Sequence, residues 1–196
     1  MLLSCGTAWV LLAVPEDLEQ GLSSGMSISR HAVEGRWGAI RSLGGVGSSF
    51  EWLLDNMYGL PGGAENRAPE NVDRARLYAG TNAAAAESAP GAGGLLFLPL
   101  AGGHNAPFGP AAGGFVGLSL HHDRGDLARS VMEGTAFELR WAIEEMRMAG
   151  VLVESLTMVG GAAKSPLWPQ IVRDVLDLPV AVPPLRAMVI LSTARR

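Results

Sequence analysis

Apolar residues occur in short blocks along the chain, often bounded by glycine or proline. In the first block, residues 1–14, Gly6 and Thr7 interrupt an otherwise apolar run that ends before Pro15. A glycine inside such a run is typical of a tight turn. We therefore predict two buried strands joined at Gly6-Thr7. After the polar, glycine- and serine-rich residues 16–29, a third strand is expected around residues 36–40.

Three segments carry their apolar residues at helical spacing. Residues 50–58 follow a glycine-rich stretch, and residues 72–86 are rich in alanine. The third and longest helix is expected to be capped by Asp123 or Asp126 and to end at Gly150. Its predicted buried face consists of Ala128, Val131, Met132, Thr135, Leu139, Ile143 and Met146.

The C-terminal part predicts a strand, a glycine turn, a helix and a second strand. Residues 151–159 are strand-like and break at Gly160-Gly161, after which an amphipathic helix is expected to begin near Ser165. Residues 178–183 close the unit. A strand that leads through glycines into a helix lets an anionic ligand approach the backbone, but the same glycines also occur for packing alone. Both interpretations stay open for an isolated Gly-Gly pair.

Composition excludes several classes of protein. The chain has 196 residues, of which 48% are apolar, so it can bury a substantial core. A formal net charge of −4 argues against a nucleic-acid surface. The single cysteine, Cys5, rules out an internal disulfide framework and fits a reducing compartment, so a cytoplasmic protein is expected. The apolar residues 1–14 are too short to span a bilayer, so no membrane partner is expected.

Other conspicuous residues have structural explanations. Cys5 lies between apolar residues and glycine, which indicates a buried inert thiol. His121-His122 precede a helix start, where capping or solvent exposure is favoured over metal binding, and no metal site is predicted. Trp52, Trp141 and Trp168 lie on predicted helices and are expected to pack in the core or between helices.

Two linked segments resemble a family signature. Residues 113–118 read Gly-Gly-Phe-Val-Gly-Leu, and residues 126–134 read Asp-Leu-Ala-Arg-Ser-Val-Met-Glu-Gly. Together they resemble the second signature of the FGGY carbohydrate kinases, with flanking segments at the family's usual distances. The resemblance covers residues 4–183 and only the C-terminal half of such a kinase, in its xylulokinase-like branch. We therefore expect an FGGY-type nucleotide-binding domain over residues 1–184 and an atypical tail over residues 185–196.

This resemblance implies an α/β fold of the actin-like ATPase, ribonuclease H-like class, with a mixed sheet flanked by helices. It also implies transfer of the ATP γ-phosphate to a sugar hydroxyl in the complete protein, with Mg²⁺ held through the nucleotide phosphates. Gly6 and Thr7 are similar to the family's second phosphate loop, and Gly47 and Glu51 to a helix start that lines the nucleotide pocket. The expected cofactor-binding residues are Gly6, Thr7, Gly47, Glu51, Gly160, Gly161 and Ser165, the last two beside adenine and ribose.

The family's catalytic aspartate precedes its second phosphate loop, so here it would lie upstream of Met1, and no catalytic residue is predicted. Most sugar-binding residues belong to the N-terminal domain. At residues 103–107, Gly-His-Asn-Ala-Pro replaces the family's Gly-Glu-Arg-x-Pro loop, and His104 and Asn105 could contact a sugar or simply cap the loop. The ending after Pro184 indicates a truncated or frame-shifted reading frame.

Two functional hypotheses follow. In the first, the chain supplies the ATP-binding half of a kinase for a pentose, pentulose or polyol and works with a separate N-terminal domain. In the second, it is a non-catalytic remnant that at most binds nucleotide weakly. An actin-like assembly or chaperone ATPase is a third, less favoured reading, and a homodimer is left open. Exposed apolar surface near residues 2–12 or 95–99 would support the first hypothesis.

Overall fold

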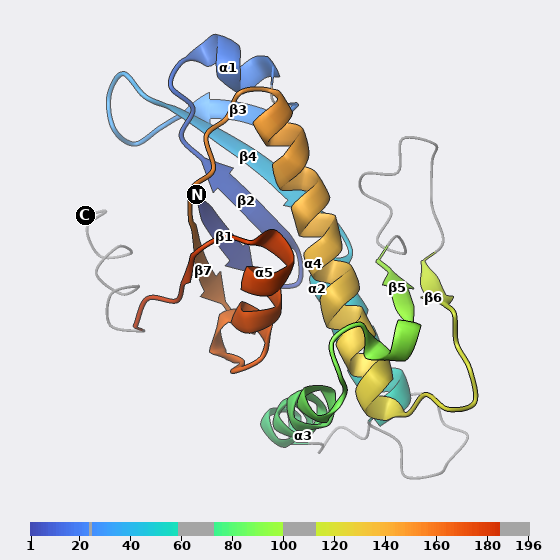
Figure 1. Cartoon of the computed structure of the whole chain (residues 1–196). Coiled ribbons are helices and arrows are strands. Elements are labelled where there is room, and N and C mark those ends of the chain that lie inside the picture. Colours follow the sequence, from blue (N-terminus) through green and yellow to red (C-terminus); the bar gives the residue numbers. More distant parts are fainter. Residues whose placement is uncertain (24, 59–72, 100–112, 185–196) are drawn as a thin grey trace.

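A six-stranded mixed sheet forms the centre of the molecule (Figure 1). The computed structural model describes residues 1–23, 25–58, 73–99 and 113–184. Neighbouring strands follow the order β3-β4-β2-β1-β7-β8, and only the β1–β7 and β7–β8 pairs are parallel. The strands are β1 (Leu2–Cys5), β2 (Trp9–Ala13), β3 (Ser27–Arg30), β4 (Trp37–Leu43), β7 (Leu156–Gly160) and β8 (Val180–Ala181).

One long helix, α4 (Arg124–Met148), runs along the sheet and also packs against a smaller two-stranded sheet (Figure 1). The small sheet pairs β5 (Leu96–Leu98) with β6 (Gly114–Val116). The other helical elements are α1 (Leu18–Ser23), α2 (Val46–Leu53), the π-helical η1 (Leu54–Tyr58), α3 (Arg74–Glu87), the 3-10 helices η2 (Ala92–Gly94) and η4 (Ala162–Lys164), and α5 (Trp168–Leu176).

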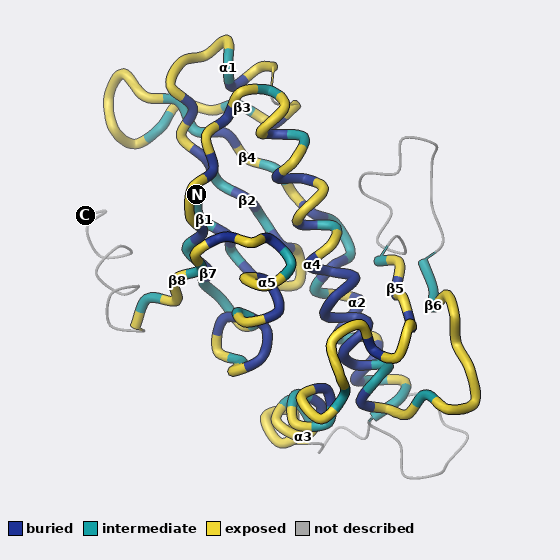
Figure 2. The backbone as a smooth tube through the Cα atoms, in the orientation of Figure 1, coloured by how far each residue is buried: buried dark blue, intermediate teal, exposed yellow. Residues whose placement is uncertain are grey.

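The core lies between one face of the large sheet and the helices. Alternate residues of β1 and β2 are buried, including Leu3, Cys5, Trp9 and Leu11, while their neighbours on the opposite face are partly exposed. The predicted face of α4, from Ala128 to Met146, is buried at every predicted position, and residues 128–136 in the N-terminal half of the helix form a continuous buried run, dark blue in Figure 2. The helical spacing of apolar residues therefore identified the α4 face correctly.

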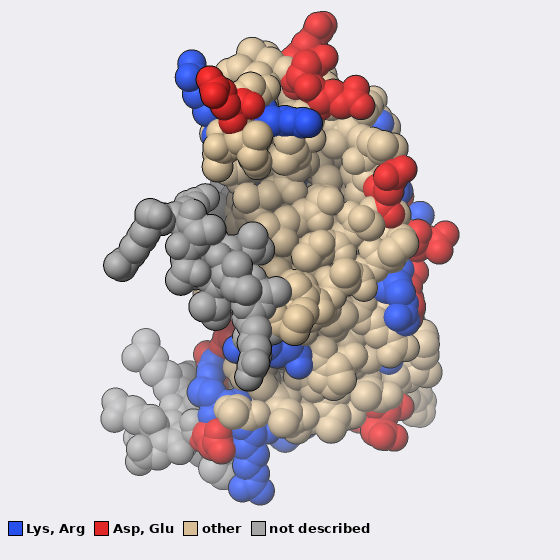
Figure 3. Space-filling model, turned by 90° about the vertical axis from the view of Figure 1, so that its left-hand side faces the viewer, with Lys and Arg blue, Asp and Glu red and all other residues tan. Residues whose placement is uncertain are grey.

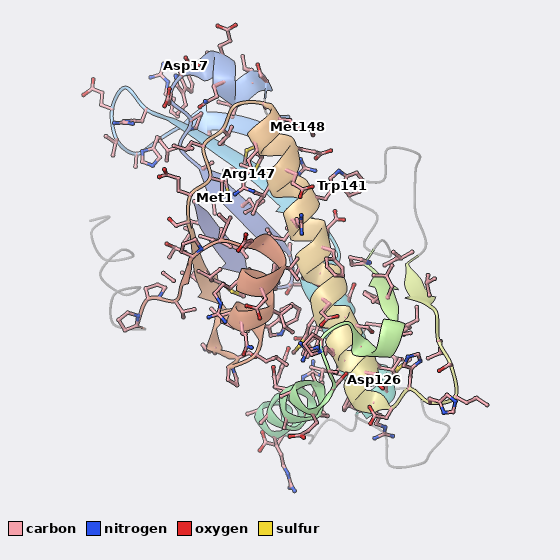
Figure 4. All side chains as sticks on the ribbon, in the orientation of Figure 1. Met1, Asp17, Asp126, Trp141, Arg147 and Met148 are labelled. Atoms are coloured by element: carbon pink, nitrogen blue, oxygen red, sulfur yellow. The ribbon has the colours of Figure 1, made fainter. Side chains whose placement is uncertain are left out.

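Both ends of α4 follow from local chemistry. Asp123 is the N-cap, and it exchanges hydrogen bonds with Asp126, whose backbone N–H donates to Asp123 and whose carboxylate accepts from the Asp123 N–H, each at 3.0 Å. The two predicted capping candidates thus form one capping box. At the other end Gly150 has a φ of +82°, as expected for the residue that terminates a helix. Figure 4 marks the two ends by Asp126 and Met148.

Residues 125–134 of α4 pack against α3 and against β5 of the small sheet. A Cβ on Gly134 would collide with the backbone of Phe97 in β5, and one on Gly125 with the carbonyl of Ala84 in α3. Between these glycines, Arg129 donates to Glu133 at 2.7 Å and to the Ser88 carbonyl at 2.8 Å. Glu133 also accepts from the Gly91 N–H at 3.1 Å. The polar residues of this helix segment therefore hold the connection between α3 and β5.

Several element boundaries differ from the predictions. α2 begins at Val46, four residues before the predicted start. β7 occupies Leu156–Gly160, whereas the strand was expected over residues 151–159. α1 and β3 occur within the polar stretch for which no element was predicted. Their residues are mostly exposed, so the hydrophobic pattern contains no clear signal for them.

The prediction for two tryptophans was wrong. Trp52 and Trp141 are 47% and 56% exposed, whereas Trp168 is 4% exposed and belongs to the core. Trp141 projects from the outer side of α4 (Figure 4). Helical position alone does not tell which face meets the sheet, and these two residues fall on the outer face. Among the described residues, no helix is both long and apolar enough to cross a membrane.

Candidate functional site

The turn between β1 and β2 packs directly on the start of α2. The Ser48 N–H donates to the Thr7 carbonyl at 3.1 Å, and a Cβ on Gly47 would overlap the Gly6 and Thr7 carbonyl oxygens. Only glycine fits at Gly47 without moving the hairpin. The backbone that closely approaches Gly47 is therefore that of the β1–β2 turn. This packing points the positive end of the α2 dipole at Gly6 and Thr7.

The end of β7 meets the same turn from the other side. Gly160 has a φ of +99°, and a Cβ there would collide with the backbone of Cys5. The Gly161 N–H then donates to the Cys5 carbonyl at 2.8 Å, where η4 begins. The parallel pairing of β1 with β7 thus brings Gly160 and Gly161 beside Gly6 and Thr7, although more than 150 positions separate them along the chain.

The predicted glycines play two different roles. At Gly47 and Gly160, neighbouring backbone occupies the space that a Cβ would need, so packing is a sufficient reason for glycine at both positions. Gly6 and Gly161 are exposed, and a Cβ on either would meet nothing closer than 3.6 Å. Thr7 is also exposed, and among the described residues no partner is found for its hydroxyl group. Around this turn, Gly6, Thr7 and Gly161 are therefore the predicted site residues that are exposed.

Ser165 joins the next helix to α3. Its hydroxyl accepts hydrogen bonds from the backbone N–H groups of Leu167 and Trp168, at 3.1 and 3.2 Å, in the turn that leads from η4 into α5. It donates to Oδ1 of Asn82 at 2.5 Å. The helix predicted to begin near Ser165 begins at Trp168, with Leu167 as its N-cap.

Glu51 is bound by a residue that the sequence patterns did not single out. The Arg74 guanidinium, at the first position of α3, pairs with both Glu51 and Asp55. Asp55 contributes the largest share of the rise in the Arg74 pKa, and Glu51 adds to it. All three side chains are substantially exposed. Glu51 therefore lies one helical turn beyond Gly47 with its charge already compensated.

An aromatic cluster holds these elements in place. Trp168 of α5 contacts Trp9 of β2 at a centroid separation of 5.1 Å and Phe50 of α2 at 5.5 Å. Phe50 stacks in turn on Tyr78 of α3 at 6.0 Å. One aromatic cluster thus joins the β1–β2 hairpin to α2, α3 and α5. These elements carry or support the predicted site residues.

The chemistry of the described residues limits the reactions that this site could perform. Cys5 is buried, as predicted, and burial raises the pKa of its thiol to about 12. Among the described ranges, no group of three His, Cys, Asp or Glu side chains could hold a metal ion. In Figure 3, charged side chains lie at the top, at the bottom and along the right-hand edge of the face, and its tan centre is largely uncharged. His104 and Asn105 lie outside the described residues.

The sequence as a whole matches the FGGY family of carbohydrate kinases, C-terminal domain, over residues 1–194. The chain belongs to this family. It is 33% identical over 181 residues to a xylulose kinase of Staphylococcus epidermidis, covering 91% of the chain and 34% of that protein. It is 34% identical to a glycerol kinase of Saccharopolyspora erythraea, covering 93% of the chain and 33% of that protein.

Solved structures of the same family share the fold. The xylulose kinase of Rhodospirillum rubrum superposes with a TM-score of 0.74 and 28% identity, over 96% of this chain and 35% of that one. The FGGY chain therefore spans about a third of the length of the relatives that it matches. The family signature at residues 113–134, which carried the resemblance, packs α3 and the small sheet on α4.

Proposed function

We propose that this FGGY domain supplies the ATP-binding half of a carbohydrate kinase, which transfers the γ-phosphate of ATP to a hydroxyl group of a pentose, pentulose or polyol. The fold that we assign is that of the actin-like, ribonuclease H-like ATPases. The observation that carries the proposal is that the start of α2 packs on Gly6 and Thr7 of the β1–β2 turn, while the end of β7 packs on the neighbouring Cys5 backbone. Family membership supplies the reaction class.

In this proposal, the phosphates of ATP bind at Gly6 and Thr7. The exposed turn offers the Thr7 hydroxyl as a donor, and the N-terminus of α2 favours negative charge by about 0.3–1 kcal/mol. Mg²⁺ would be held through the phosphates, since the described residues offer no ligand cluster of their own. The nucleoside extends along η4 from Gly161 towards Ser165 and α3, and Glu51 lines the α2 side of the site.

The proposal assigns no catalytic base to the chain. Among the described residues near the turn, Glu51 and Asp55 are paired with Arg74, and neither is available to orient a sugar hydroxyl. We propose that the base and most of the sugar contacts belong to an N-terminal domain on another polypeptide or in a longer product. Within the chain, residues 1–184 would form the nucleotide-binding domain, with residues 185–196 as a tail. A cytoplasmic location is part of the same proposal.

Exposed apolar residues support a partner domain. Leu96 and Leu98 of β5 and Val116 of β6 are 38%, 36% and 52% exposed, and the register of the strands puts Leu96 opposite Val116 on the outer face of the small sheet. Leu96 and Leu98 fall within residues 95–99, one of the two segments where exposed apolar surface was expected if the chain works with a separate N-terminal domain. A second copy of the chain is the alternative occupant.

The test is calorimetric titration of the chain with Mg·ATP and Mg·ADP. Micromolar binding that is lost in Thr7→Ala and in Gly161→Val would support the ATP-binding half, because both changes affect the exposed surface. Co-expression with an N-terminal FGGY domain should then restore ATP turnover with a sugar acceptor. A chain that gives no heat with either nucleotide would favour the alternative, a non-catalytic remnant.

A further inference from the structure

The hydroxyl group of Ser165 has no hydrogen-bonding capacity left for a ligand. A serine hydroxyl donates one hydrogen bond and accepts two. Here its proton goes to Asn82 Oδ1, and its two acceptor positions take the N–H groups of Leu167 and Trp168. A nucleoside that bound to Ser165 directly would have to break one of these three bonds.

The side-chain amide of Asn82, unlike the Ser165 hydroxyl, still has hydrogen-bonding capacity for a ligand. Its Nδ2 donates one hydrogen to the Tyr78 carbonyl at 2.7 Å, and its Oδ1 accepts from Ser165 at 2.5 Å. One N–H and one acceptor position of the amide remain. The two bonds also fix which end of the amide is which, because the Tyr78 carbonyl requires a donor and the Ser165 proton requires an acceptor. Asn82 is partly buried on α3.

We propose that Asn82, and not Ser165, hydrogen-bonds the nucleoside and selects adenine over guanine, with Ser165 as its positioning residue. This inference rests on the nucleotide site proposed above. A fixed amide presents one acceptor and one donor side by side. Adenine offers the complementary donor and acceptor at N6 and N7, whereas guanine offers two acceptors at O6 and N7. The Asn82 Oδ1 would face the O6 of guanine without a proton between them.

The position of Asn82 separates it from the phosphate side of the site. Ser165, its partner, lies four residues beyond Gly161, which is about 8 Å at the 2.0 Å rise of a 3-10 helix. Tyr78, one turn before Asn82, stacks on Phe50 and thereby ties this part of α3 to α2. A change at Asn82 should therefore affect the nucleoside and leave a ligand without a nucleoside unaffected.

The experiment is titration of the whole chain with Mg·ADP, Mg·GDP and Mg·tripolyphosphate, with unfolding followed in parallel. In Asn82→Ala we expect about tenfold weaker ADP binding, a reduced preference for ADP over GDP, and tripolyphosphate affinity within about twofold of the wild type. Asn82→Asp keeps the acceptor for Ser165 and should still lose ADP affinity, since it cannot donate. Adding Ser165→Ala to Asn82→Ala should cause little further loss.

Asn56 gives a matched control, because its Nδ2 donates to the Trp52 carbonyl at 2.8 Å in the same within-helix manner, and among the described residues its side chain forms no hydrogen bond with Ser165 or Gly161. Asn56→Ala should leave all three affinities unchanged. Asn82→Ala that keeps the ADP affinity and preference, or weakens tripolyphosphate equally, would overturn the role of Asn82 alone. A wild-type chain that binds none of the three ligands would instead overturn the proposed nucleotide site and this inference with it.

Discussion

Arg129 and Glu133 form a buried ion pair within α4, with 2.7 Å between Nε and Oε1 and about a tenth of each side chain exposed. The two residues lie one helical turn apart. Arg129 also donates to the Ala85 and Ser88 carbonyls, and Glu133 accepts from the Gly91 N–H. It therefore connects the family signature to the segment between α3 and β5.

Removing one partner of this pair should destabilise the domain. Glu133→Ala leaves the Arg129 charge buried without its carboxylate, for which we expect a loss of about 3–5 kcal/mol in the free energy of unfolding. Urea unfolding monitored by circular dichroism measures it. Arg140 and Glu144 provide a control with the same spacing and the same 2.7 Å separation on the exposed side of α4. Glu144→Ala should cost about 0.5 kcal/mol or less, and equal losses in the two variants would contradict the role given to burial.

Two glycines in helices should respond to alanine with opposite signs. Gly47→Ala forces a Cβ into the carbonyls of the β1–β2 turn, so we expect reduced stability and weaker nucleotide binding. Gly80 lies inside α3, where a Cβ would meet no atom within 4 Å, so Gly80→Ala should raise stability by about 0.5–1 kcal/mol. Thermal unfolding of both variants checks the pair. A stabilised Gly47→Ala would show that the turn is not packed as described.

The Cys5 thiol should be unreactive in the folded chain. Burial raises its pKa from 9.0 to about 12, so at pH 8 almost no thiolate forms and Ellman's reagent should label it only after unfolding. The raised pKa also means that the folded state holds this proton more tightly than the unfolded one. Its contribution to stability is complete below about pH 9 and is lost as the pH rises towards 12.

A comparison of Cys5→Ala with the wild type isolates this effect. The loss of stability between about pH 9 and 11 should be smaller in the variant, because the titrating thiol is absent. Rapid labelling of the native chain at about pH 8 would contradict the buried position of Cys5 at the centre of the site.

The two tryptophans Trp168 and Trp141 should differ in their effect on stability. Trp168→Ala empties the contact shared with Trp9 and Phe50 and should cost about 3–5 kcal/mol. Trp141, 56% exposed on α4, should tolerate alanine with a change within about 0.5 kcal/mol. Denaturant unfolding of the two variants gives the comparison. Similar losses would mean that the outer face of α4 is covered in solution.

The hydrophobic pattern located the elements that frame the site. The Gly6-Thr7 turn, the α4 face from Ala128 to Met146 and the glycine turn after β7 were all predicted from spacing and turn residues. These features depend on neighbours close in sequence, which a pattern can represent. The exposed α1 and β3 left no such pattern, and their structure depends on packing at the edge of the sheet.

The sequence by itself determined the family, the order of the main elements and the residues expected at the nucleotide. Only the tertiary structure decided which of those residues are used in packing and which are exposed. In the folded chain, Gly47 and Gly160 pack against neighbouring backbone, while Gly6, Thr7 and Gly161 are exposed. Two residues of α3 contact predicted site residues: Arg74 pairs with Glu51, and Asn82 accepts a hydrogen bond from Ser165. The reason is physical. A β-hairpin, a parallel strand pair and two helix starts meet only after the chain folds, and hydrogen-bond capacity is shared among partners that are distant in sequence.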